Sequence, residues 1–317
     1  MSHSHIAKKL RYLPLQERQK IKWERSHKVN FYEIDEEFLP EAPQFFSDEE
    51  FRQIRKHPEI KNFILDFYRW NKEVLWLVNS TSHPYISMQQ TLARQADSHI
   101  GEVLVDLGCG TGGFCSQLLQ VDGKAIRKIF AIDIDWKALV EVPEALRQAN
   151  YCGKVALIQG SSMSRLPIWD GSVDSVVSSL GGLMYAGWWF EGGKLVAQKR
   201  LALINCLQDI NRVLRPNGCL AFSAPKPEPD WGAILRDSVG WLIKTGRLTE
   251  LYKAIRYGVP AKKLSAFMNR VERAGYAHYL CVEEWQALLE QTGFEIISSS
   301  FGECYAKQGV VIVARKA

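Results

Sequence analysis

An acid followed by closely spaced glycines, from Asp106 to Gly112, is the part of the sequence best suited to bind a ligand. Asp106 stands two residues before Gly108, and Gly110 and Gly112 follow at alternate positions. Because glycine has no Cβ, its backbone can turn tightly and approach a ligand closely. The apolar run 103–107 predicts a buried strand, and the residues after the glycines have helical spacing. This order is typical of nucleotide-binding turns, since the N–H groups at the start of the helix face the ligand.

The glycine spacing by itself allows two cofactors. Gly108, Gly110 and Gly113 also fit the pattern G-x-G-x-x-G, which occurs in turns that bind dinucleotides. Asp106 favours the other cofactor, because its charge would repel a pyrophosphate but could interact, directly or through water, with an ammonium group. The segment 106–112, Asp-Leu-Gly-Cys-Gly-Thr-Gly, resembles the first motif of class I S-adenosylmethionine-dependent methyltransferases. The resemblance implies S-adenosyl-L-methionine as the cofactor, with contacts from Asp106, Gly108, Cys109, Gly110 and Gly112.

A second acid, Asp133, ends the next apolar run, 128–133, about twenty residues beyond the glycine loop. A carboxylate in this position can accept hydrogen bonds from both ribose hydroxyls of an adenosine group in either cofactor family. Asp133 therefore predicts adenosine binding without choosing between the cofactors. We expect Ile134 to lie against the adenine face.

The third expected strand, 155–160, is followed by residues that we assign to the adenine. In the methyltransferases that the sequence resembles, an acidic residue often stands after this strand and accepts a hydrogen bond from the adenine amine. This chain has Ser161 there instead. We expect Ser161 or Ser162 to accept that hydrogen bond weakly and Met163 to provide a soft apolar contact. Ser179, near the end of the fourth expected strand, completes the predicted cofactor site.

Further segments extend the resemblance from about residue 101 to 316. The run 166–174 contains Leu-Pro, Asp-Gly-Ser and Asp in the order that leads to the fourth strand of these methyltransferases, and an expected helix at 194–214 ends in a similar way to theirs. The alternation of strands and helices predicts a doubly wound α/β sheet. The resemblance adds that the sheet is Rossmann-like, mostly parallel and seven-stranded, with 294–301 and 310–314 as a final antiparallel pair.

The sequence divides into an N-terminal part and a larger domain. We expect residues 1–100 to form an arm and helices that cover the cofactor site. Residues 101–317 are expected to form the S-adenosylmethionine-binding domain, with a helical insertion at about 226–281 that acts as a lid.

The N-terminal part combines a charged arm with two expected helices. Residues 8–28 hold eight Lys or Arg and 33–50 hold eight Asp or Glu, which favours a solvated arm over a nucleic-acid tail. A capping box at 47–50 predicts a short helix, and apolar spacing predicts a second over 60–78, which His-Pro-Tyr at 83–85 would end. Four aromatic residues could cover a sulfonium or an aromatic substrate, or could pack against the sheet: Tyr68, Trp70, Trp76 and Tyr85.

Composition and charge argue against several classes of protein. The net charge of +5 is modest for 317 residues and does not indicate a nucleic-acid partner. The seven cysteines are scattered and include no Cys-x-x-Cys pair, so neither a disulfide framework nor a zinc site is predicted, and a reducing cytoplasm fits best. We expect no membrane span and no signal sequence, since the apolar stretches are too short.

The expected insertion is basic and partly amphipathic. Leu248, Leu251, Tyr252 and Ile255 share one helical face, and the segment 231–275 holds nine Lys or Arg against three acids. Such helices could close over a lipophilic acceptor, or could meet an acceptor held on an anionic membrane, a carrier protein or a phosphate tail. A solvated basic surface above ordinary core explains the same pattern.

The resemblance implies that a substrate nucleophile directly displaces the sulfonium methyl group, without a metal, so that alignment supplies most of the acceleration. Four side chains could act as a base near the strand ends, although each also has an ordinary structural explanation: His83, Tyr185, Glu191 and Glu303. An aromatic run after the fourth strand indicates either an apolar or aromatic acceptor or a buried hydrophobic loop: Met184, Tyr185, Trp188, Trp189 and Phe190.

The leading functional prediction is methyl transfer to a small, lipophilic or aromatic metabolite, with oxygen as the favoured acceptor atom. The loop after the fourth strand lacks the Asn/Asp-Pro-Pro-aromatic sequence of enzymes that methylate base or glutamine nitrogens. An RNA methyltransferase and a non-catalytic subunit that binds S-adenosylmethionine stay open as alternatives. The sequence does not indicate an oligomeric state.

Overall fold

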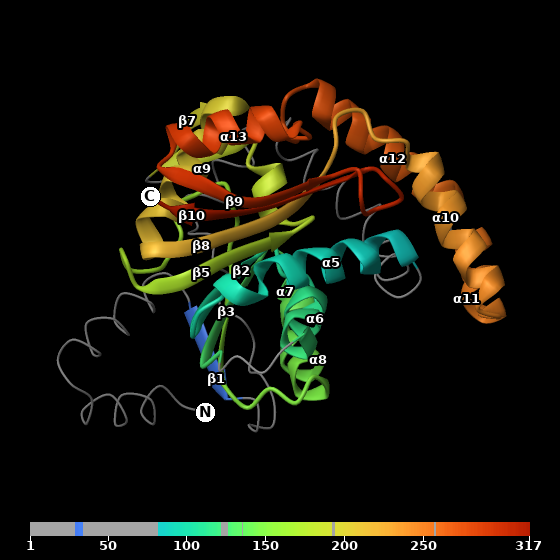
Figure 1. Ribbon diagram of the computed structural model, residues 1–317, viewed down its shortest axis with the longest axis horizontal. Helices are drawn as coiled ribbons and strands as arrows, with labels where there is room; N and C mark the ends of the chain where they lie inside the picture. Colours follow the sequence, from blue (N-terminus) through green and yellow to red (C-terminus); the bar gives the residue numbers. More distant parts are fainter. Residues whose placement is uncertain (1–28, 34–81, 122–125, 135, 192–193, 257) are drawn as a thin grey trace.

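An eight-stranded sheet organises the computed structural model, which describes residues 29–33 and 82–317 except 122–125, 135, 192–193 and 257 (Figure 1). The strand order is β1-β4-β3-β2-β5-β8-β10-β9. The strands are β1 (Val29–Glu33), β2 (Val103–Leu107), β3 (Lys128–Asp133), β4 (Lys154–Gln159), β5 (Val173–Ser179), β8 (Leu214–Pro225), β9 (Phe294–Phe301) and β10 (Gly309–Lys316).

The five central strands, from β4 across to β8, are parallel, and β10 lies antiparallel between β8 and β9. These seven strands confirm the predicted doubly wound, mostly parallel α/β sheet. The eighth strand, β1, was not predicted, and it pairs antiparallel with β4 from Val29 opposite Ile158 to Glu33 opposite Lys154. A strand of only five residues is too short to show a clear periodicity. Its hydrogen-bond partner lies far away in the sequence, so the local sequence does not indicate that a strand forms here.

Successive residues of the central strands face two separate apolar layers. On β2, Leu104 belongs to one layer and Val105 to the other, and on β3 Ile129 and Phe130 alternate in the same way. Parallel sheets are normally covered on both faces, which explains the nearly continuous apolar runs in these strands. The strand positions could therefore be predicted from the sequence.

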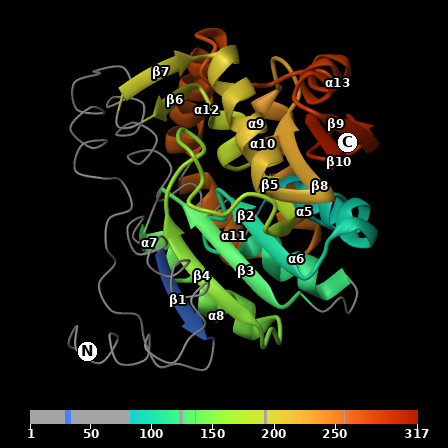
Figure 2. The same cartoon turned by 90° about the vertical axis from the view of Figure 1, so that its left-hand side faces the viewer.

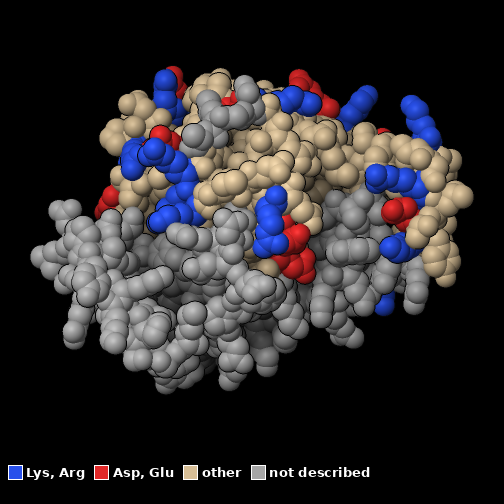
Figure 3. Space-filling view, turned by 90° about the horizontal axis from the view of Figure 1, so that it is seen from below, with Lys and Arg blue, Asp and Glu red and all other residues tan. Residues whose placement is uncertain are grey.

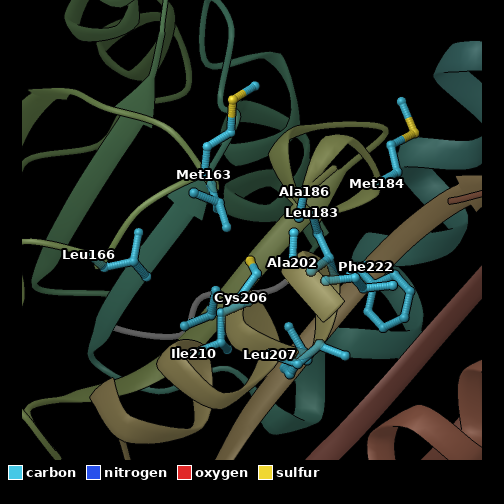
Figure 4. Close-up of a cluster of buried hydrophobic side chains, with 14 of the residues drawn as sticks. Met163, Leu166, Leu183, Met184, Ala186, Ala202, Cys206, Leu207, Ile210 and Phe222 are labelled. Atoms are coloured by element: carbon cyan, nitrogen blue, oxygen red, sulfur yellow. The ribbon is translucent and has the colours of Figure 1, made fainter. Parts of the chain in front are cut away.

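Helices cover each face of the sheet (Figure 1). One face carries α5 (His83–Ala96), α6 (Gly113–Val121), α7 (Trp136–Leu139) and α8 (Val142–Gln148), and the other carries α9 (Arg200–Val213) and α13 (Val282–Gln291). Figure 4 shows the second layer, in which Ala202, Cys206, Leu207 and Ile210 of α9 gather with Phe222 of β8.

Two sequence predictions differ from the structure in this region. His83, Pro84 and Tyr85 begin α5, where we expected them to end a helix. The Ser82 side chain accepts a hydrogen bond from the Tyr85 N–H at 3.3 Å, and proline suits the first turn because its missing N–H is not needed there. The helices predicted over 47–57 and 60–78 lie outside the described residues.

The helix predicted over 194–214 begins only at Arg200. The preceding residues form β7 (Lys194–Gln198), which pairs antiparallel with β6 (Trp188–Glu191). Bulky aromatic residues in β6 favour a strand, and the hairpin packs against α9 (Figure 2). The partner strand therefore decided the structure of 194–198.

The insertion is helical, as predicted, and contains α10 (Trp231–Lys244), α11 (Leu248–Arg256) and α12 (Gly258–Arg273). The Asp230 carboxylate accepts a hydrogen bond from the Ala233 N–H at 3.0 Å and caps α10. Gly246 ends α10 with a φ of 69°, a left-handed conformation that suits glycine. No helix among the described residues is both long and apolar enough to cross a membrane.

Candidate functional site

The glycine loop lies at the carboxyl end of β2 and is held by β3. The N–H groups of Gly108 and Cys109 both donate to the Ile132 carbonyl, at 2.7 and 3.1 Å. Gly108, Gly110 and Gly112 have φ angles of 76°, 54° and 83°. Glycine adopts such left-handed angles at no steric cost. The alternate glycines of the sequence are therefore the residues at which the backbone has a positive φ angle. The loop leads directly into α6.

Gly108 and Gly110 require glycine for different reasons. A Cβ on Gly108 would lie 2.1 Å from the Gly182 nitrogen, because the loop after β2 touches the loop after β5. A Cβ on Gly110 would meet no heavy atom within 4 Å, so the space beside this residue is open. An open space beside a glycine loop that leads into a helix start fits the predicted cofactor.

Asp133, at the end of β3, contacts this loop directly. Its Oδ2 accepts a hydrogen bond from the Gly110 N–H at 2.8 Å, and the side chain is half-buried. The carboxylate therefore lies beside the open space at Gly110. This is the place where a ribose acid was predicted.

Asp106 lies inside the protein, with 1% of its surface exposed. The pKa of its carboxyl group is raised to about 7, mainly by burial and also by the negative charge of Asp133, although a hydrogen bond from the Cys115 thiol at 3.1 Å lowers it. A cationic group beside Asp106 would favour the ionised form. The charge arrangement therefore suits an ammonium ligand better than a phosphate.

The residues predicted to contact adenine lie at the carboxyl ends of β3 and β4, where several of them also hold the loops together. The Ser161 Oγ accepts a hydrogen bond from the Met163 N–H at 2.9 Å, and the Ser162 hydroxyl donates to the Gly182 carbonyl at 2.5 Å. Met163 is buried in the apolar layer that faces α9 (Figure 4). Ile134 is half-buried, and its carbonyl accepts a hydrogen bond from the Gln159 side chain at 3.1 Å.

Two remaining members of the predicted cofactor set are also buried. The Cys109 side chain is 7% exposed, and its Sγ lies 3.5 Å from the Gly110 carbonyl oxygen. Ser179 lies at the end of β5, with its Oγ 3.5 Å from that of Ser223 on β8. The structure therefore gathers the whole predicted set at the carboxyl edge of the parallel strands.

Two of the four candidate bases have side-chain partners, and a third is exposed to solvent. His83 lies 3.0 Å from the Asp237 carboxylate and stacks on Trp241. Glu191 accepts a hydrogen bond from the indole of Trp189 at 3.2 Å, and Glu303 is exposed in the turn between β9 and β10.

The fourth candidate, Tyr185, belongs to a group of four tyrosines from separate segments, which we call the tyrosine cluster: Tyr85, Tyr185, Tyr279 and Tyr305. Tyr85 lies on α5, and its Oη accepts a hydrogen bond from the Gln89 side chain at 3.0 Å. Burial raises the pKa of Tyr85, and the nearby Tyr305 hydroxyl and the carboxylates of Asp106 and Asp133 add to this shift. Tyr85 therefore connects the cluster to the acids of the cofactor site.

Tyr305 is held in the cluster by a strained turn. Tyr305, Ala306 and Lys307 have φ angles of 56°, 53° and 64°, which cost non-glycine residues about 1–2 kcal/mol each. Gln308 supports the turn: its N–H donates to the Tyr305 carbonyl at 3.0 Å, and its side-chain oxygen accepts from the Asp230 N–H at 2.9 Å. The turn is thereby tied to Asp230, the N-cap residue of α10, and Tyr305 is only 7% exposed.

The Tyr279 hydroxyl is buried and makes no hydrogen bond of good geometry among the described residues, although the Tyr185 hydroxyl lies close enough to influence its pKa as a hydrogen-bonding neighbour. The Tyr279 ring contacts Trp231 of α10 edge-on at 6.2 Å, and Tyr185 contacts Met268 of α12. An unpaired buried hydroxyl costs about 1–3 kcal/mol, which a ligand with a suitable polar atom would offset. Sequence reasoning missed Tyr279 and Tyr305, because nothing in their local sequence distinguishes them from core tyrosines.

The aromatic run after β5 is mostly core. Met184, Trp188, Trp189 and Phe190 are each at most 5% exposed, and Trp188 stacks on Tyr276 with ring centroids 4.3 Å apart. The hydrophobic-loop interpretation therefore describes these four residues. They pack in the apolar layer that contains α9 and residues of α12.

Comparisons with known proteins assign the chain to a family. The family model for a methyltransferase domain matches residues 98–293. No curated protein matches the chain. These matched residues begin just after α5, extend past the end of α13 and include both acids and the glycine loop.

Several solved structures are similar to the chain at low identity. A protein described as a possible exported protein from Bordetella parapertussis is 17% identical, with a TM-score of 0.48, over 72% of this chain and 66% of that one. A SAM-dependent methyltransferase from Aquifex aeolicus is 16% identical, with a TM-score of 0.45, over 74% and 93%. A chain from the complex of the Haloferax volcanii Trm112 methyltransferase activator with a methyltransferase is 14% identical, with a TM-score of 0.49, over 79% and 96%.

The family model covers more than half of the 317 residues and includes the glycine loop, Asp106 and Asp133. The chain therefore belongs to the methyltransferase domain family, and its cofactor is S-adenosylmethionine.

Proposed function

We propose that this protein transfers the methyl group of S-adenosylmethionine to a small, lipophilic or aromatic acceptor, and that the acceptor binds at the tyrosine cluster. The observation that carries this proposal is the unpaired, buried hydroxyl of Tyr279. It lies near Tyr185, and Tyr85 connects the cluster to Asp106 and Asp133. A mostly apolar site with a few convergent polar atoms is typical of small-molecule binding.

The residues of the chain would act mainly by positioning. S-adenosylmethionine supplies an electrophilic methyl group when it is bound. The glycine loop and Asp133 would hold its adenosine part, and Asp106 would face its ammonium group. Alignment of the two reactants is then the main source of acceleration.

The chemistry of the cluster favours an acidic oxygen as the acceptor atom. Tyrosine hydroxyls are neutral near pH 7, and burial raises the pKa of all four still further above this pH, so they can donate hydrogen bonds. Neutral phenols at this pH are poor bases. An acceptor that ionises by itself near pH 7, such as a carboxylic acid or a phenol made acidic by electron-withdrawing groups, needs no base, and the tyrosine hydroxyls would orient its oxygen.

Access to the cluster would depend on both additions to the core domain. The N-terminal part contributes Tyr85 and Gln89 through α5, and the insertion contributes Trp231, which contacts Tyr279. The start of the insertion is also tied to the turn of Tyr305 through Gln308. These contacts support a role of the insertion as a lid for the acceptor.

Tyr279→Phe should make the protein more stable and less active. Removing an unpaired buried hydroxyl should raise the free energy of unfolding by about 1 kcal/mol, because its desolvation cost disappears. The same change should lower kcat/KM for the acceptor by about tenfold, since one orienting hydrogen bond is lost. Urea denaturation measures the first effect, and transfer of label from radiolabelled S-adenosylmethionine to fractionated cell extract measures the second.

Tyr151→Phe is the matched control for this test. Tyr151 is also buried, but its hydroxyl donates to the Lys154 carbonyl at 3.4 Å, at the opposite end of β4 from the site. Tyr151→Phe should lower stability by about 1 kcal/mol and leave methyl transfer unchanged. If Tyr279→Phe kept full activity, the acceptor would not use this hydroxyl.

The labelling experiment also tests the two alternative functions. Label in RNA that is lost after RNase treatment would overturn the small-molecule proposal. Tight retention of the cofactor without transfer of label to any fraction would indicate a non-catalytic subunit.

The affinity for S-adenosylmethionine should rise as the pH rises through about 7. In the free protein the raised pKa keeps a proton on part of the Asp106 population near neutrality, and a nearby ammonium group favours the ionised carboxylate. Binding should therefore release protons between about pH 6 and 8. Titration calorimetry in two buffers with different ionisation enthalpies measures the release. Asp106→Asn should bind more weakly without it, and an equal release from that variant would assign the proton to another group.

A further inference from the structure

The hairpin formed by α10 and α11 extends beyond the sheet and its covering helices (Figure 1). Its inner face has a small apolar core of its own, in which Leu242 and Ala254 are buried and contact Trp241 and Leu251. This core is separate from the two layers that cover the sheet. The hairpin therefore has an inner contact of its own, and the side chains of its outer face do not belong to that core.

The outer face is apolar and exposed. We call the four side chains Ile243, Leu248, Tyr252 and Ile255 the hairpin tip, and they are 59%, 71%, 66% and 69% exposed. No other large hydrophobic side chain among the described residues is as exposed as these four. The three on α11 lie at positions i, i+4 and i+7, which is one helical face. A gathered apolar surface of this kind usually marks an interaction site.

Basic side chains surround the hairpin tip. Lys244 and Arg247 are exposed in the turn between the helices. Glu250 is the single acid in the segment 241–255. Figure 3 shows Lys and Arg side chains at the end of the molecule that this hairpin forms. Apolar side chains within a basic surround match the interface of an anionic bilayer, where the apolar groups enter the headgroup region and the cations contact lipid phosphates.

We propose that the α10–α11 hairpin binds peripherally to anionic membranes, with the hairpin tip in the headgroup region. A lipid surface fits better than a folded protein partner, because the tip projects outward and would need a complementary groove in a protein. The binding does not depend on the acceptor's identity or on methyl transfer. Trp231, at the other end of α10, contacts Tyr279, so docking would bring the tyrosine cluster towards the lipid surface.

Co-sedimentation with vesicles tests this proposal. The full chain should bind vesicles of phosphatidylcholine with phosphatidylglycerol much more strongly than vesicles of phosphatidylcholine alone. Leu248→Gln, Tyr252→Gln and Ile255→Gln together should weaken binding to the anionic vesicles by about tenfold or more, because three inserted apolar groups are lost. Glutamine keeps helix propensity, so α11 should persist. Leu201→Gln, on α9 and 55% exposed, is the matched control and should leave binding unchanged.

A second pair of changes tests the charges. Lys244→Gln with Arg247→Gln should weaken binding to anionic vesicles and reduce its dependence on salt, since fewer cations face the lipid. Calorimetric titration with S-adenosylmethionine should give wild-type affinity for every variant, which would show that the fold is intact.

The proposal would be wrong if the wild-type protein did not bind anionic vesicles, or if the triple variant bound them as well as the wild type. A dimer in light scattering that the triple variant abolishes, without vesicle binding, would assign the face to a second copy of the chain.

Discussion

Gly108→Ala should destabilise the protein by about 3–5 kcal/mol, because the new Cβ would meet backbone and the residue would keep an unfavourable φ angle. The Cβ would lie 2.1 Å from the Gly182 nitrogen and 2.9 Å from the Gly181 Cα, neither of which can move aside as a side-chain end could. The contact between the loops after β2 and β5 would have to open. Urea denaturation of the variant and the wild type measures the loss.

Two other glycines separate the clash from the backbone angle. Gly171 has a φ of 56° and open space around its Cβ position, far along the chain from the glycine loop, so Gly171→Ala should cost only about 1–2 kcal/mol. Gly110→Ala should cost a similar amount in stability and should also weaken S-adenosylmethionine binding, because its Cβ would enter the open space. Equal losses for Gly108→Ala and Gly171→Ala would show that the two loops do not pack as tightly as the structure indicates.

Asp133→Ala should weaken S-adenosylmethionine binding by about 1.5–3 kcal/mol, which is roughly a ten- to two-hundredfold rise in Kd. Hydrogen bonds from two ribose hydroxyls to a carboxylate would be lost, and the Gly110 N–H would lose its partner at 2.8 Å. Titration calorimetry measures the change. Asp133→Asn should have an intermediate effect, because an amide oxygen can still accept from Gly110 but carries no charge.

Asp174→Ala is the control for Asp133. The Asp174 carboxylate accepts hydrogen bonds from the Val103 N–H at 2.8 Å and from Arg215 at 2.5 Å, near the start of β5 and at the opposite edge of the sheet. This change should lower stability and leave cofactor affinity unaltered. A folded Asp133→Ala variant with wild-type affinity would mean that another residue holds the ribose.

The parallel strands and the glycine loop could be predicted because their signals are local. β2 to β5 are buried on both faces, which requires apolar runs, and the loop needs glycines at fixed spacing. β7 and the start of α9 could not be predicted from the sequence. Residues 194–198 have no strong strand propensity of their own and form a strand because they pair with β6. α5 was missed because His-Pro-Tyr indicates either the end or the beginning of a helix, and the capping by Ser82 decides between them.

Some residues of the site could likewise be predicted from a local sequence pattern, and others are brought together only by the fold. Asp106 and the glycines are consecutive, and Asp133 follows at a characteristic distance, so the sequence pattern contains most of the cofactor-binding geometry. The tyrosine cluster draws one residue from each of four separate segments, and only the folded chain brings them together. Among the predicted bases, His83 and Glu191 have partners that explain them, because sequence position near a strand end does not fix where a side chain points.

The edge strand β1 has a consequence for how the chain folds. Val29 pairs with Ile158, more than a hundred residues away, so this pairing must close a very long loop. Contacts of such high sequence separation form late, after the local strand–helix units of the sheet have assembled. Until then the edge of β4 carries unpaired N–H and carbonyl groups that another chain could pair with. We therefore expect refolding at high protein concentration to favour aggregation, with residues 29–33 as the segment that closes this edge.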